Sequence, residues 1–324
     1  MERGADLQRA ARVLAEGGLV AFPTETVYGL GADAARDDAV ARIFAAKGRP
    51  RAHPLIVHLA DAALLDAGWA IDIPDAAREL ARRCWPGPLT LILRKGPRVA
   101  GATTGGADTV GIRVPSHPVA RALLAQFVGG VAAPSANRFG GVSPTTADHV
   151  AADLAGVVGY LLDGGACDVG VESTILDLTR GRPVLLRPGG LPREAIEPIT
   201  GPLLVPDAAA PAAPGTLASH YAPSAVVYAC APAEVPARVA AAAGKRVAVL
   251  APAALFATWR DLAAVAYPLP DDPAGMAHEL YTALRELDAR GVDVVIAALP
   301  PAAGLGEAVG DRLRRAAGPR RDSE

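Results

Sequence analysis

The sequence contains little cysteine, few aromatic residues and almost no lysine, and the first two shortages already exclude some classes of protein. The three cysteines, Cys84, Cys167 and Cys230, lie far apart and form no CxxC or Cys/His metal spacing. We therefore expect reduced thiols in a cytoplasmic protein, and neither a disulfide scaffold nor a zinc site. Because aromatic residues make up only 4% of the chain, its core must consist mainly of alanine, valine and leucine.

Long hydrophobic runs and a strong net charge are also missing. The longest apolar run, near residues 247–259, is too short and too interrupted by proline to span a membrane. Residues 1–8 are polar and charged, which is unlike a signal peptide. The net charge is −2, so bulk attraction to nucleic acid is not the expected main mode of binding, although a local arginine patch remains possible.

The chain lacks the short motifs of several enzyme classes. It has no G-x-x-x-x-G-K-[ST] phosphate loop, no G-x-S-x-G motif, no H-E-x-x-H motif and no EF-hand loop. A P-loop NTPase is therefore not expected. Any chemistry must come from polar turns that are scattered along the chain.

A length of 324 residues favours two domains. The first part mixes short strands with helices, which is typical of an α/β or α+β sheet domain. Strands are predicted over 19–22, 55–59, 89–93, 110–114, 131–133, 157–162, 174–178 and 184–186. Helices are predicted over 37–47, with Asp37 as N-cap, and over 74–83, 117–127 and 148–154.

A proline-rich stretch separates this part from a more regular one. We predict a catalytic domain over 1–200, a semi-rigid linker over 201–223, a second domain over 224–318 and a tail over 319–324. The second domain alternates strands with helices, which favours a small parallel, Rossmann-like sheet. It has no G-x-G-x-x-G after its first strand, so dinucleotide binding is not proposed. Strands are predicted there over 225–228, 247–250, 264–267 and 292–297, and helices over 235–243, 253–262, 273–290 and 306–317.

Lysine is the rarest positive charge, because 29 of the 32 basic residues are arginines (32 − 3). One of the three lysines, Lys47, ends a predicted helix in the turn Lys47-Gly48-Arg49-Pro50. A compact ammonium beside a flat guanidinium suits a phosphate-bearing ligand. The alternative is a solvated basic helix end that complements the helix dipole.

Other polar turns offer further candidate groups. The stretch 23–31 follows a strand and combines hydroxyls, a carboxylate and glycines, so it can hold a small polar ligand or serve as a structural turn. His53 and His58 follow Lys47, and a histidine taken singly is more often a structural residue than a ligand. Arg113 interrupts an apolar strand. Its guanidinium either binds a carboxylate in a pocket or faces solvent at a sheet edge.

Three more polar turns lie at strand ends, where α/β sheets bind ligands. They are the stretches 133–137 leading to Ser143, 170–175 and 187–190. A last one, His220-Tyr221-Ala222-Pro223, ends the linker. For the stretch 133–137 and the following residues 143–146, structural turns and helix caps are the alternative, and for Thr145 and Thr146 this alternative is favoured.

Together these stretches resemble the YrdC-like family of L-threonylcarbamoyladenylate synthases in its longer, two-domain form. The motifs are PTETVYGLG, KGRP with HPL, the Arg113 strand, PSAN, GVESTI, RPGG and APGTLASHYAP, and they cover nearly the whole chain. The resemblance implies a twisted mixed sheet with helices, followed by a smaller Rossmann-like parallel α/β domain. It also implies a nucleotidyltransferase that condenses L-threonine, bicarbonate or CO2 and ATP into threonylcarbamoyl-AMP, releases pyrophosphate and serves tRNA threonylcarbamoyladenosine modification.

The resemblance also implies a role for each polar turn. Lys47 and Arg49 would act on the triphosphate as catalytic residues, with Mg²⁺ carried mainly by the nucleotide and no protein metal ligand. ATP would be bound by Lys47, Arg49, His53, Thr109, Ser135, Asn137, Ser143, Arg187 and Tyr221, the last on a linker that acts as a lid. Threonine would be bound by Thr26, His58, Arg113, Ala133 and Ser173, with Arg113 pairing its carboxylate. A separate tRNA-modifying complex would receive the product.

Two rival functions follow from the same features. A double-stranded RNA-binding module without adenylate synthesis would use a basic patch of Arg42, Lys47, Arg49 and Arg51. The near-neutral net charge and the Thr/Ser-rich turns count against it. A carbamoyltransferase of the hydrogenase-maturation type carries a related domain but also cysteine-rich zinc fingers, which three cysteines exclude.

Overall fold

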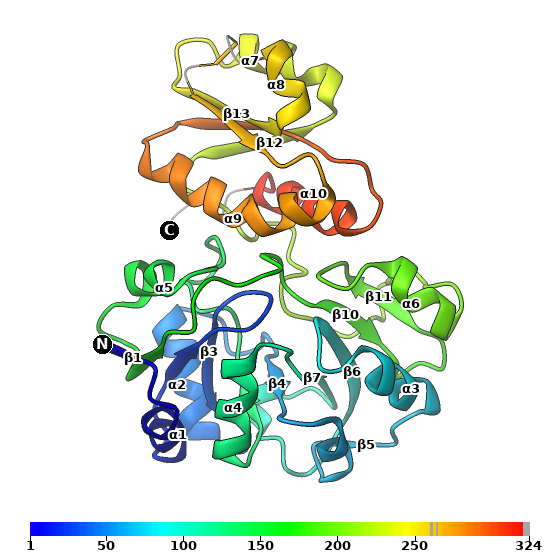
Figure 1. Ribbon diagram of the computed structural model, residues 1–324. Coiled ribbons are helices and arrows are strands. Elements are labelled where there is room, and N and C mark those ends of the chain that lie inside the picture. The colour runs from blue at the N-terminus through cyan, green and yellow to red at the C-terminus, as the bar shows by residue number, and fades with distance from the viewer. Residues whose placement is uncertain (260–261, 264, 320–324) are drawn as a thin grey trace. The chain divides into compact units, whose positions relative to one another are not determined.

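A computed structural model describes residues 1–259, 262–263 and 265–319, and they form two compact units (Figure 1). The first unit contains Met1–Phe139, Ser143–Asp168 and Glu172–Thr216. The second contains Gly140–Val142, Val169–Val171 and the described residues from Leu217 onward. Parts of the segments predicted over 253–262, 264–267 and 319–324 lie outside the described residues.

The first unit is built on a mixed sheet. Eleven strands of the described chain follow the order β1-β9-β2-β3-β8-β4-β7-β6-β10-β11, with β5 paired to β6. The strands β4 and β7 run parallel, as do β6 and β10, whereas β6 and β7 are antiparallel. The strands are β1 Glu2–Gly4, β2 Val20–Phe22, β3 Gly29–Asp33, β4 Ile56–His58, β5 Ala70–Ile71, β6 Leu89–Lys95, β7 Thr109–Arg113, β8 Val131–Ala132, β9 Tyr160–Leu162, β10 Thr174–Asp177 and β11 Val184–Arg187.

Helices cover both faces of this sheet. Along β2, Val20 and Phe22 pack in one cluster with residues of α1 and α4, whereas Ala21 packs in the other cluster with α2. This alternation is the period of two that a strand requires. The clusters consist mostly of alanine, valine and leucine, as predicted. The helices are α1 Leu7–Ala15, α2 Asp37–Lys47, α3 Asp75–Cys84, α4 Pro118–Phe127, α5 Ala147–Leu154 and α6 Arg193–Thr200.

The predicted helices over 37–47, 74–83, 117–127 and 148–154 are all confirmed, but Asp37 is not an N-cap. The N-cap of α2 is Arg36, which makes no side-chain cap bond. The Asp37 carboxylate instead accepts a hydrogen bond from the Ala102 backbone N–H at 2.7 Å, because a neighbouring 3-10 turn presents that donor.

Two helices of the first unit were not predicted. In α1, Asp6 caps the N-terminus by accepting from the Arg9 N–H at 2.9 Å, and the helix buries Ala10, Val13 and Leu14. That i, i+3, i+4 spacing is a helical signal that the polar start of the chain obscures. In α6, Pro198 lies inside the helix, and this proline obscured the helical pattern at the end of the predicted catalytic domain.

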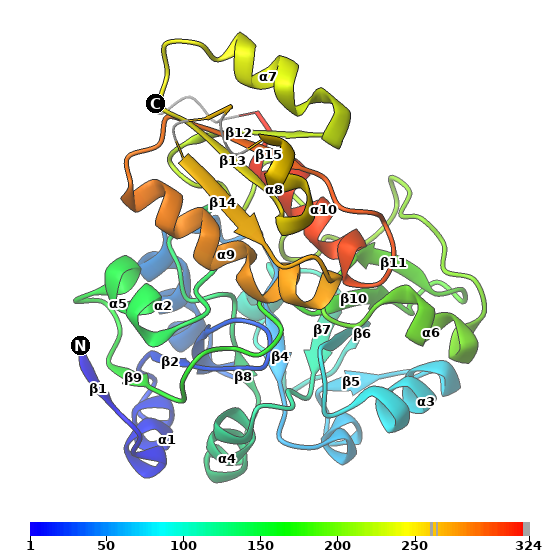
Figure 2. The same cartoon turned by 45° about the horizontal axis from the view of Figure 1, so that its top comes forward.

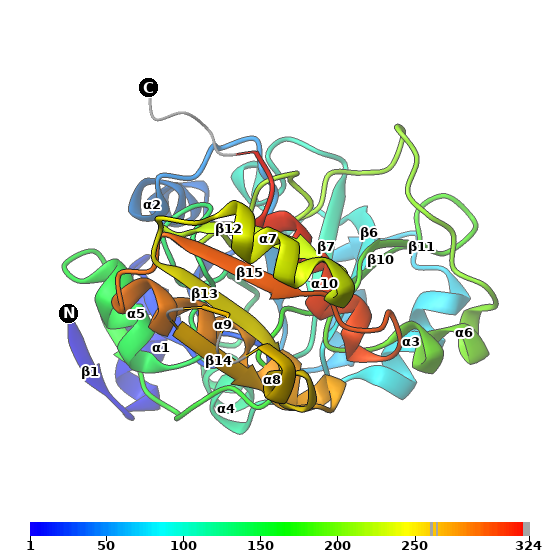
Figure 3. The same cartoon turned by 90° about the horizontal axis from the view of Figure 1, so that it is seen from above.

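The second unit is built on a parallel sheet of four described strands in the order β12-β15-β13-β14 (Figure 3). The helices α7 and α8 lie on one face, and α9 and α10 lie on the other (Figures 1 and 2). The strands are β12 Val226–Cys230, β13 Val247–Pro252, β14 Val265–Leu269 and β15 Val294–Ala298. The helices are α7 Val235–Ala241, α8 Ala253–Trp259, α9 Pro273–Ala289 and α10 Leu305–Ala316.

Both sheets confirm the predicted fold class. The last strand of the second unit, β15, is inserted between β12 and β13. This order differs from the order 3-2-1 of a dinucleotide-binding half, in which strands that follow one another along the chain are neighbours in the sheet. The difference agrees with the missing G-x-G-x-x-G motif.

The stretch predicted as a linker is divided between the units, with residues through Thr216 in the first and those from Leu217 in the second. Its beginning extends the edge of the first sheet, because Leu204 bridges Val184 in a parallel β-bridge. The Leu204 carbonyl accepts from the Leu185 N–H at 2.9 Å.

Candidate active site

Lys47 is buried at the end of α2 and contacts the turn that contains Ser135 and Asn137. Gly48 ends the helix in the left-handed conformation, at φ 65°, which glycine adopts without strain. The Lys47 side chain, which is only 3% exposed, donates from Nζ to the Ser135 carbonyl at 2.6 Å and to the Asn137 carbonyl. The alternative of a solvated helix end is therefore wrong.

The surroundings of Lys47 disfavour its positive charge. Burial, and then the neighbouring Arg49 guanidinium, place the pKa of Lys47 well below its ordinary value, whereas Asp153 acts weakly in the opposite direction. Among the described residues no carboxylate forms an ion pair with Lys47. An anionic ligand at this position would therefore stabilise the ammonium form.

Arg49 and His53 fold back over Phe139. The Arg49 side chain is buried, donates from Nη2 to the Pro54 carbonyl at 3.0 Å and lies 5.7 Å from the centre of the Phe139 ring. His53 packs edge-on against the same ring, with the ring centres 5.5 Å apart. The Phe139 N–H donates to the Lys47 carbonyl at 2.9 Å, so the KGRP and PSAN motifs form one structure.

The PTETVYGLG motif is a turn followed by a strand, since Gly29, Leu30 and Gly31 begin β3 and were wrongly assigned to a loop. It pairs with the PSAN motif through backbone bonds. The Leu30 N–H donates to the Pro134 carbonyl and the Ala136 N–H donates to the Tyr28 carbonyl, both at 2.8 Å. Ala133 is anchored beside them by its own N–H, which donates to Ile56 at 2.9 Å.

Arg113 is the centre of a second buried group. Its side chain, at the end of β7, is 4% exposed and forms an ion pair with Glu25 at 2.8 Å. It also donates from Nη1 to the Thr26 hydroxyl at 2.9 Å and from Nε to the Gly87 carbonyl at 3.3 Å. The alternative of an arginine in solvent is therefore wrong.

His58 lies directly beside Arg113, because β4 and β7 pair in parallel with His58 opposite Arg113. Burial, and then the charge of Arg113, lower the pKa of His58 to about 3. The imidazole is therefore neutral at physiological pH. Among the described residues its buried Nδ1 atom has no hydrogen-bond partner, so it can accept a bond from a ligand.

Ser173 and Arg187 form a third group, which joins the GVESTI and RPGG motifs. Arg187 donates from Nη2 to the Ser173 carbonyl at 2.8 Å and to its hydroxyl at 3.3 Å. The Ser173 hydroxyl also lies 2.8 Å from that of Thr90. A side chain at Gly189 would place its Cβ 2.4 Å from the Glu172 carbonyl oxygen, so this close approach requires glycine.

Ser143 belongs to the same neighbourhood through Glu172. Its hydroxyl donates to the Glu172 carboxylate at 2.6 Å, and both side chains are buried.

The structure does not bring Thr109 into these groups. Thr109 begins β7 and is partly buried, four residues and therefore about 13 Å along the strand from Arg113.

Tyr221 belongs to the second unit, where other side chains of that unit surround its ring. Its side chain is 1% exposed, and its backbone has φ 61°. The Arg312 guanidinium lies 5.0 Å from the centre of its ring, and Tyr281 stacks on it at 5.9 Å. His220 packs against the same ring at 4.2 Å.

Sequence reasoning assigned no role to two buried carboxylates. Glu25 pairs with Arg113, and Glu172 accepts from Ser143. Glu25 stands between two threonines in a motif that was singled out, so the signal was present. What the sequence could not provide was its partner, which lies 88 residues away (113 − 25).

Some features of other sites are not found among the described residues. No group of three or more His, Cys, Asp or Glu side chains could hold a metal ion there. No described helix is long and apolar enough to cross a membrane. The three cysteines are free thiols.

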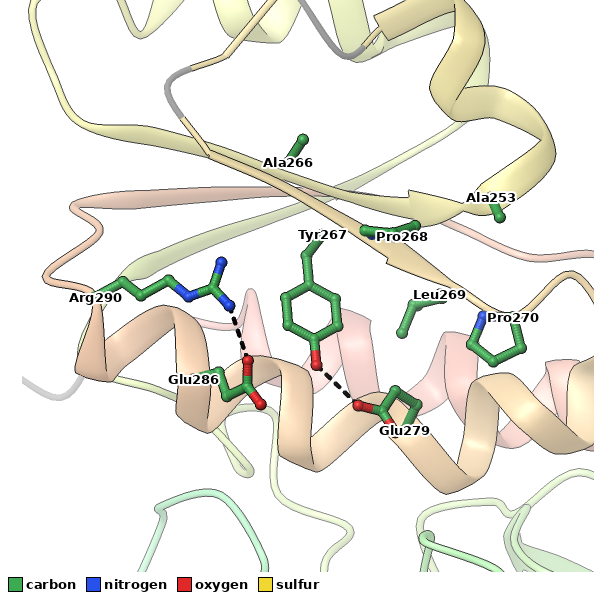
Figure 4. A pocket seen from close by; sticks show the side chains of 9 residues that line it. All are labelled: Ala253, Ala266, Tyr267, Pro268, Leu269, Pro270, Glu279, Glu286 and Arg290. Carbon is green, nitrogen blue, oxygen red and sulfur yellow. Dashed lines mark hydrogen bonds and ion pairs between the residues drawn. The ribbon is translucent and has the colours of Figure 1, made fainter.

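The second unit has a surface pocket of about 580 Å³ that contains none of the predicted site residues (Figure 4). It lies between β14 and α9. Among its lining residues, Tyr267 donates to the Glu279 carboxylate at 2.8 Å, and Arg290 pairs with Glu286 at 3.0 Å.

Comparison with known proteins identifies the family to which a chain with this fold and these buried groups belongs. Residues 12–189 match the family model described as "Telomere recombination", which covers the YrdC-type domain. Residues 191–318 match the model described as "Threonylcarbamoyl-AMP synthase, C-terminal domain". The chain thus combines a YrdC-type domain with a second domain that has its own family.

Individual relatives agree over nearly the full length. The chain is 46% identical to threonylcarbamoyl-AMP synthase of Pyrococcus abyssi, over 95% of this chain and 93% of the relative. It is 42% identical to that of Bacillus subtilis, over 97% and 93%. A crystal structure of P. abyssi Sua5 complexed with L-threonine is similar with a TM-score of 0.88 and 43% identity, over 98% of this chain and 96% of that one. The chain belongs to the threonylcarbamoyl-AMP synthase family, in the two-domain Sua5 form, which confirms the enzyme class inferred from its motifs.

Proposed function

We propose that this enzyme binds ATP at Lys47 and Arg49 and L-threonine at Arg113, and joins them through a carbamate. The observation that carries this placement is the burial of two separate cationic groups in one unit. One is a lysine beside an arginine, which suits phosphates, and the other is an arginine beside hydroxyls and an imidazole, which suits an amino acid. The P. abyssi relative was crystallised with L-threonine, which supports the second assignment.

The chemistry follows from these positions. The neutral threonine amine reacts with CO2 and loses a proton, or reacts with bicarbonate and releases water, to give a carbamate. A carbamate oxygen then attacks the α-phosphorus of ATP while pyrophosphate leaves. Charge builds up on phosphate oxygens in this step, so buried cations that are already in position lower the barrier. Lys47 and Arg49 supply those cations. No protein nucleophile is needed.

The remaining residues complete the two subsites. The nucleotide site would be completed by His53, Ser135, Asn137, Ser143 and Arg187, and the threonine site by Thr26, His58, Ala133 and Ser173. Within the described part of the chain, two buried carboxylates beside these groups are engaged, Glu25 by Arg113 and Glu172 by Ser143. This donor set does not favour a protein-bound Mg²⁺, so the ion would be held by triphosphate oxygens.

The deciding experiment supplies ATP, L-threonine and bicarbonate and measures pyrophosphate release. Release should occur with all three and cease when threonine is omitted. Unchanged release without threonine would overturn the proposal. Threonylcarbamoyl-AMP is a mixed anhydride that reacts with water, so the product would pass directly to a tRNA-modifying complex. We expect both steps to take place in the cytoplasm.

Protection from water motivates the lid hypothesis for Tyr221. We expect Tyr221→Ala to raise ATP hydrolysis without product, because a closed site excludes water from the intermediates. Unchanged product yield and unchanged hydrolysis would show that Tyr221 has no such role. RNA binding remains the alternative function, and it would appear as salt-dependent RNA affinity without pyrophosphate release.

A further inference from the structure

Glu25 is a buried carboxylate that the placement of substrates above leaves without a role. It is 4% exposed and lies in the turn between β2 and β3, flanked by Thr24 and Thr26. Its carboxylate forms an ion pair with Arg113 at 2.8 Å. Two buried charges of opposite sign therefore lie side by side where the amino-acid substrate is expected.

Arg113 has donors left for a substrate. A guanidinium carries five N–H groups, and among the described residues three are used, by Glu25, the Thr26 hydroxyl and the Gly87 carbonyl. A substrate carboxylate can therefore bind Arg113 without displacing Glu25. The Glu25 carboxylate then faces a ligand whose other end is positive.

Charge balance favours a ligand that carries both signs. The Glu25–Arg113 pair is neutral as a whole, and an amino acid in its zwitterionic form adds no net charge to the buried group. A simple carboxylic acid would add an uncompensated negative charge beside Glu25, which is unfavourable in a poorly solvated site.

We propose that Glu25 binds the α-ammonium group of the substrate and so restricts the site to α-amino acids. This inference rests on the proposed function, in which Arg113 holds the threonine carboxylate. The two ends of the zwitterion then face the two ends of the Glu25–Arg113 pair. Thr26, bonded to both Arg113 and Thr24, keeps the turn that carries Glu25 in place.

The ionisation of Glu25 agrees with this role. Burial alone would raise the pKa of Glu25, but the charge and hydrogen bond of Arg113, together with backbone hydrogen bonds from Glu25 and Ser116, outweigh it, and the pKa lies below its ordinary value. The carboxylate is therefore charged at neutral pH and attracts an ammonium group.

The test compares two ligands that differ only in the amine. L-Threonine and (R)-3-hydroxybutanoate share the carboxylate, the hydroxyl and the methyl group. Calorimetric titration should show that the unmodified enzyme binds threonine at least about tenfold more tightly. Equal affinity for the two ligands would overturn the proposal without any substitution.

The variant Glu25→Gln removes the charge and keeps the shape. Threonine affinity should fall about tenfold or more, while 3-hydroxybutanoate should bind as before or more tightly. An equal loss for both ligands would mean that Glu25 only supports Arg113, and an unchanged threonine affinity would also refute the idea. Glu16→Gln, at an exposed glutamate, is the matched control. If the unmodified enzyme binds no threonine at all, the proposed function itself fails, which is a different result.

Discussion

The two units of this protein differ in how far their charged side chains are exposed to solvent. In the first, several charged side chains are enclosed, among them Lys47 and Arg113, which are 3% and 4% exposed. In the second, the ion pair between Arg290 and Glu286, two residues that line the pocket in Figure 4, leaves both side chains 47% exposed. Among the described residues of the second unit, Arg312 and His220 are the buried polar side chains, and both contact Tyr221 or lie next to it.

This difference indicates which unit contains the ligand-binding groups. Enclosing a charge opposes folding unless partners compensate it, so a sheet needs no buried arginine for stability. The second unit shows that a four-stranded sheet can be packed almost entirely with apolar side chains. The enclosed charges of the first unit are therefore best explained by ligands that they bind.

The largest expected effect comes from Arg113→Ala. Threonine affinity should fall by about 2–5 kcal/mol, because a desolvated charge-assisted pair is lost. Calorimetric titration of threonine measures this, and Arg94→Ala, at an exposed arginine on β6, is the control. The circular dichroism spectrum of the variant must match that of the unmodified protein, since Glu25 loses its partner. Equal threonine affinity would refute the role of Arg113.

Lys47→Ala should give the next largest effect, on turnover and not on threonine binding. Removing one cation that stabilises the transition state lowers kcat by about 10²–10³-fold. Pyrophosphate release measures the rate, and titration checks that threonine affinity is nearly unchanged. Lys245→Ala, at an exposed lysine of the second unit, should have no effect on either quantity. A rate within a factor of two of the unmodified enzyme would make Lys47 a structural residue.

A further effect, on stability in acid solution, is expected from the titration of His58. Its pKa in the folded protein is about 3, below the ordinary 6.5, so the unfolded chain binds the proton more readily. The stabilising contribution is complete above pH 6.5 and is lost as the pH falls, by about 1.4 kcal/mol per pH unit at most. Denaturant unfolding at several pH values should therefore show a flatter acid dependence for His58→Gln. Identical pH profiles would mean that His58 does not contribute.

The smallest effect should come from Arg290→Ala in the second unit. An exposed i, i+4 pair contributes only about 0–1 kcal/mol to stability, because solvent screens it. The free energy of unfolding should therefore change little, and pyrophosphate release should not change. A loss of activity comparable to that of Lys47→Ala would contradict the contrast between the units.

The sequence predicted most elements but not how they meet. Helices such as the one over residues 37–47 were recognisable from their apolar positions and the signals at their ends, and most strands were recognisable from their apolar runs. The strand β3 was not, because it begins Gly-Leu-Gly and glycine is a poor strand former. There the missing side chain permits close packing, since a Cβ at Gly31 would lie 2.8 Å from Phe22 and Val131.

The environment of each polar residue was also beyond the sequence. Alternation placed Arg113 on the face opposite Ile112 and Val114, yet all three are buried because both faces of the sheet are covered. Whether Arg113 faced solvent or a pocket therefore depended on helices elsewhere in the chain. The contact of Lys47 with Asn137 spans 90 residues, and local pattern carries no information about such a distance.

The pairing of β4 with β7 has a consequence for how such a chain can change over generations. His58 and Arg113 are neighbours only because Ile56, Val57 and His58 pair with Gly111, Ile112 and Arg113 in one register. A single codon inserted within either strand would turn one of these side chains to the opposite face. The same insertion in the exposed turn at Gly106, where no atom lies within 4 Å of an added Cβ, would leave the pairing intact. Lineages of this enzyme should therefore differ in loop length between the two strands and keep the strands themselves free of insertions.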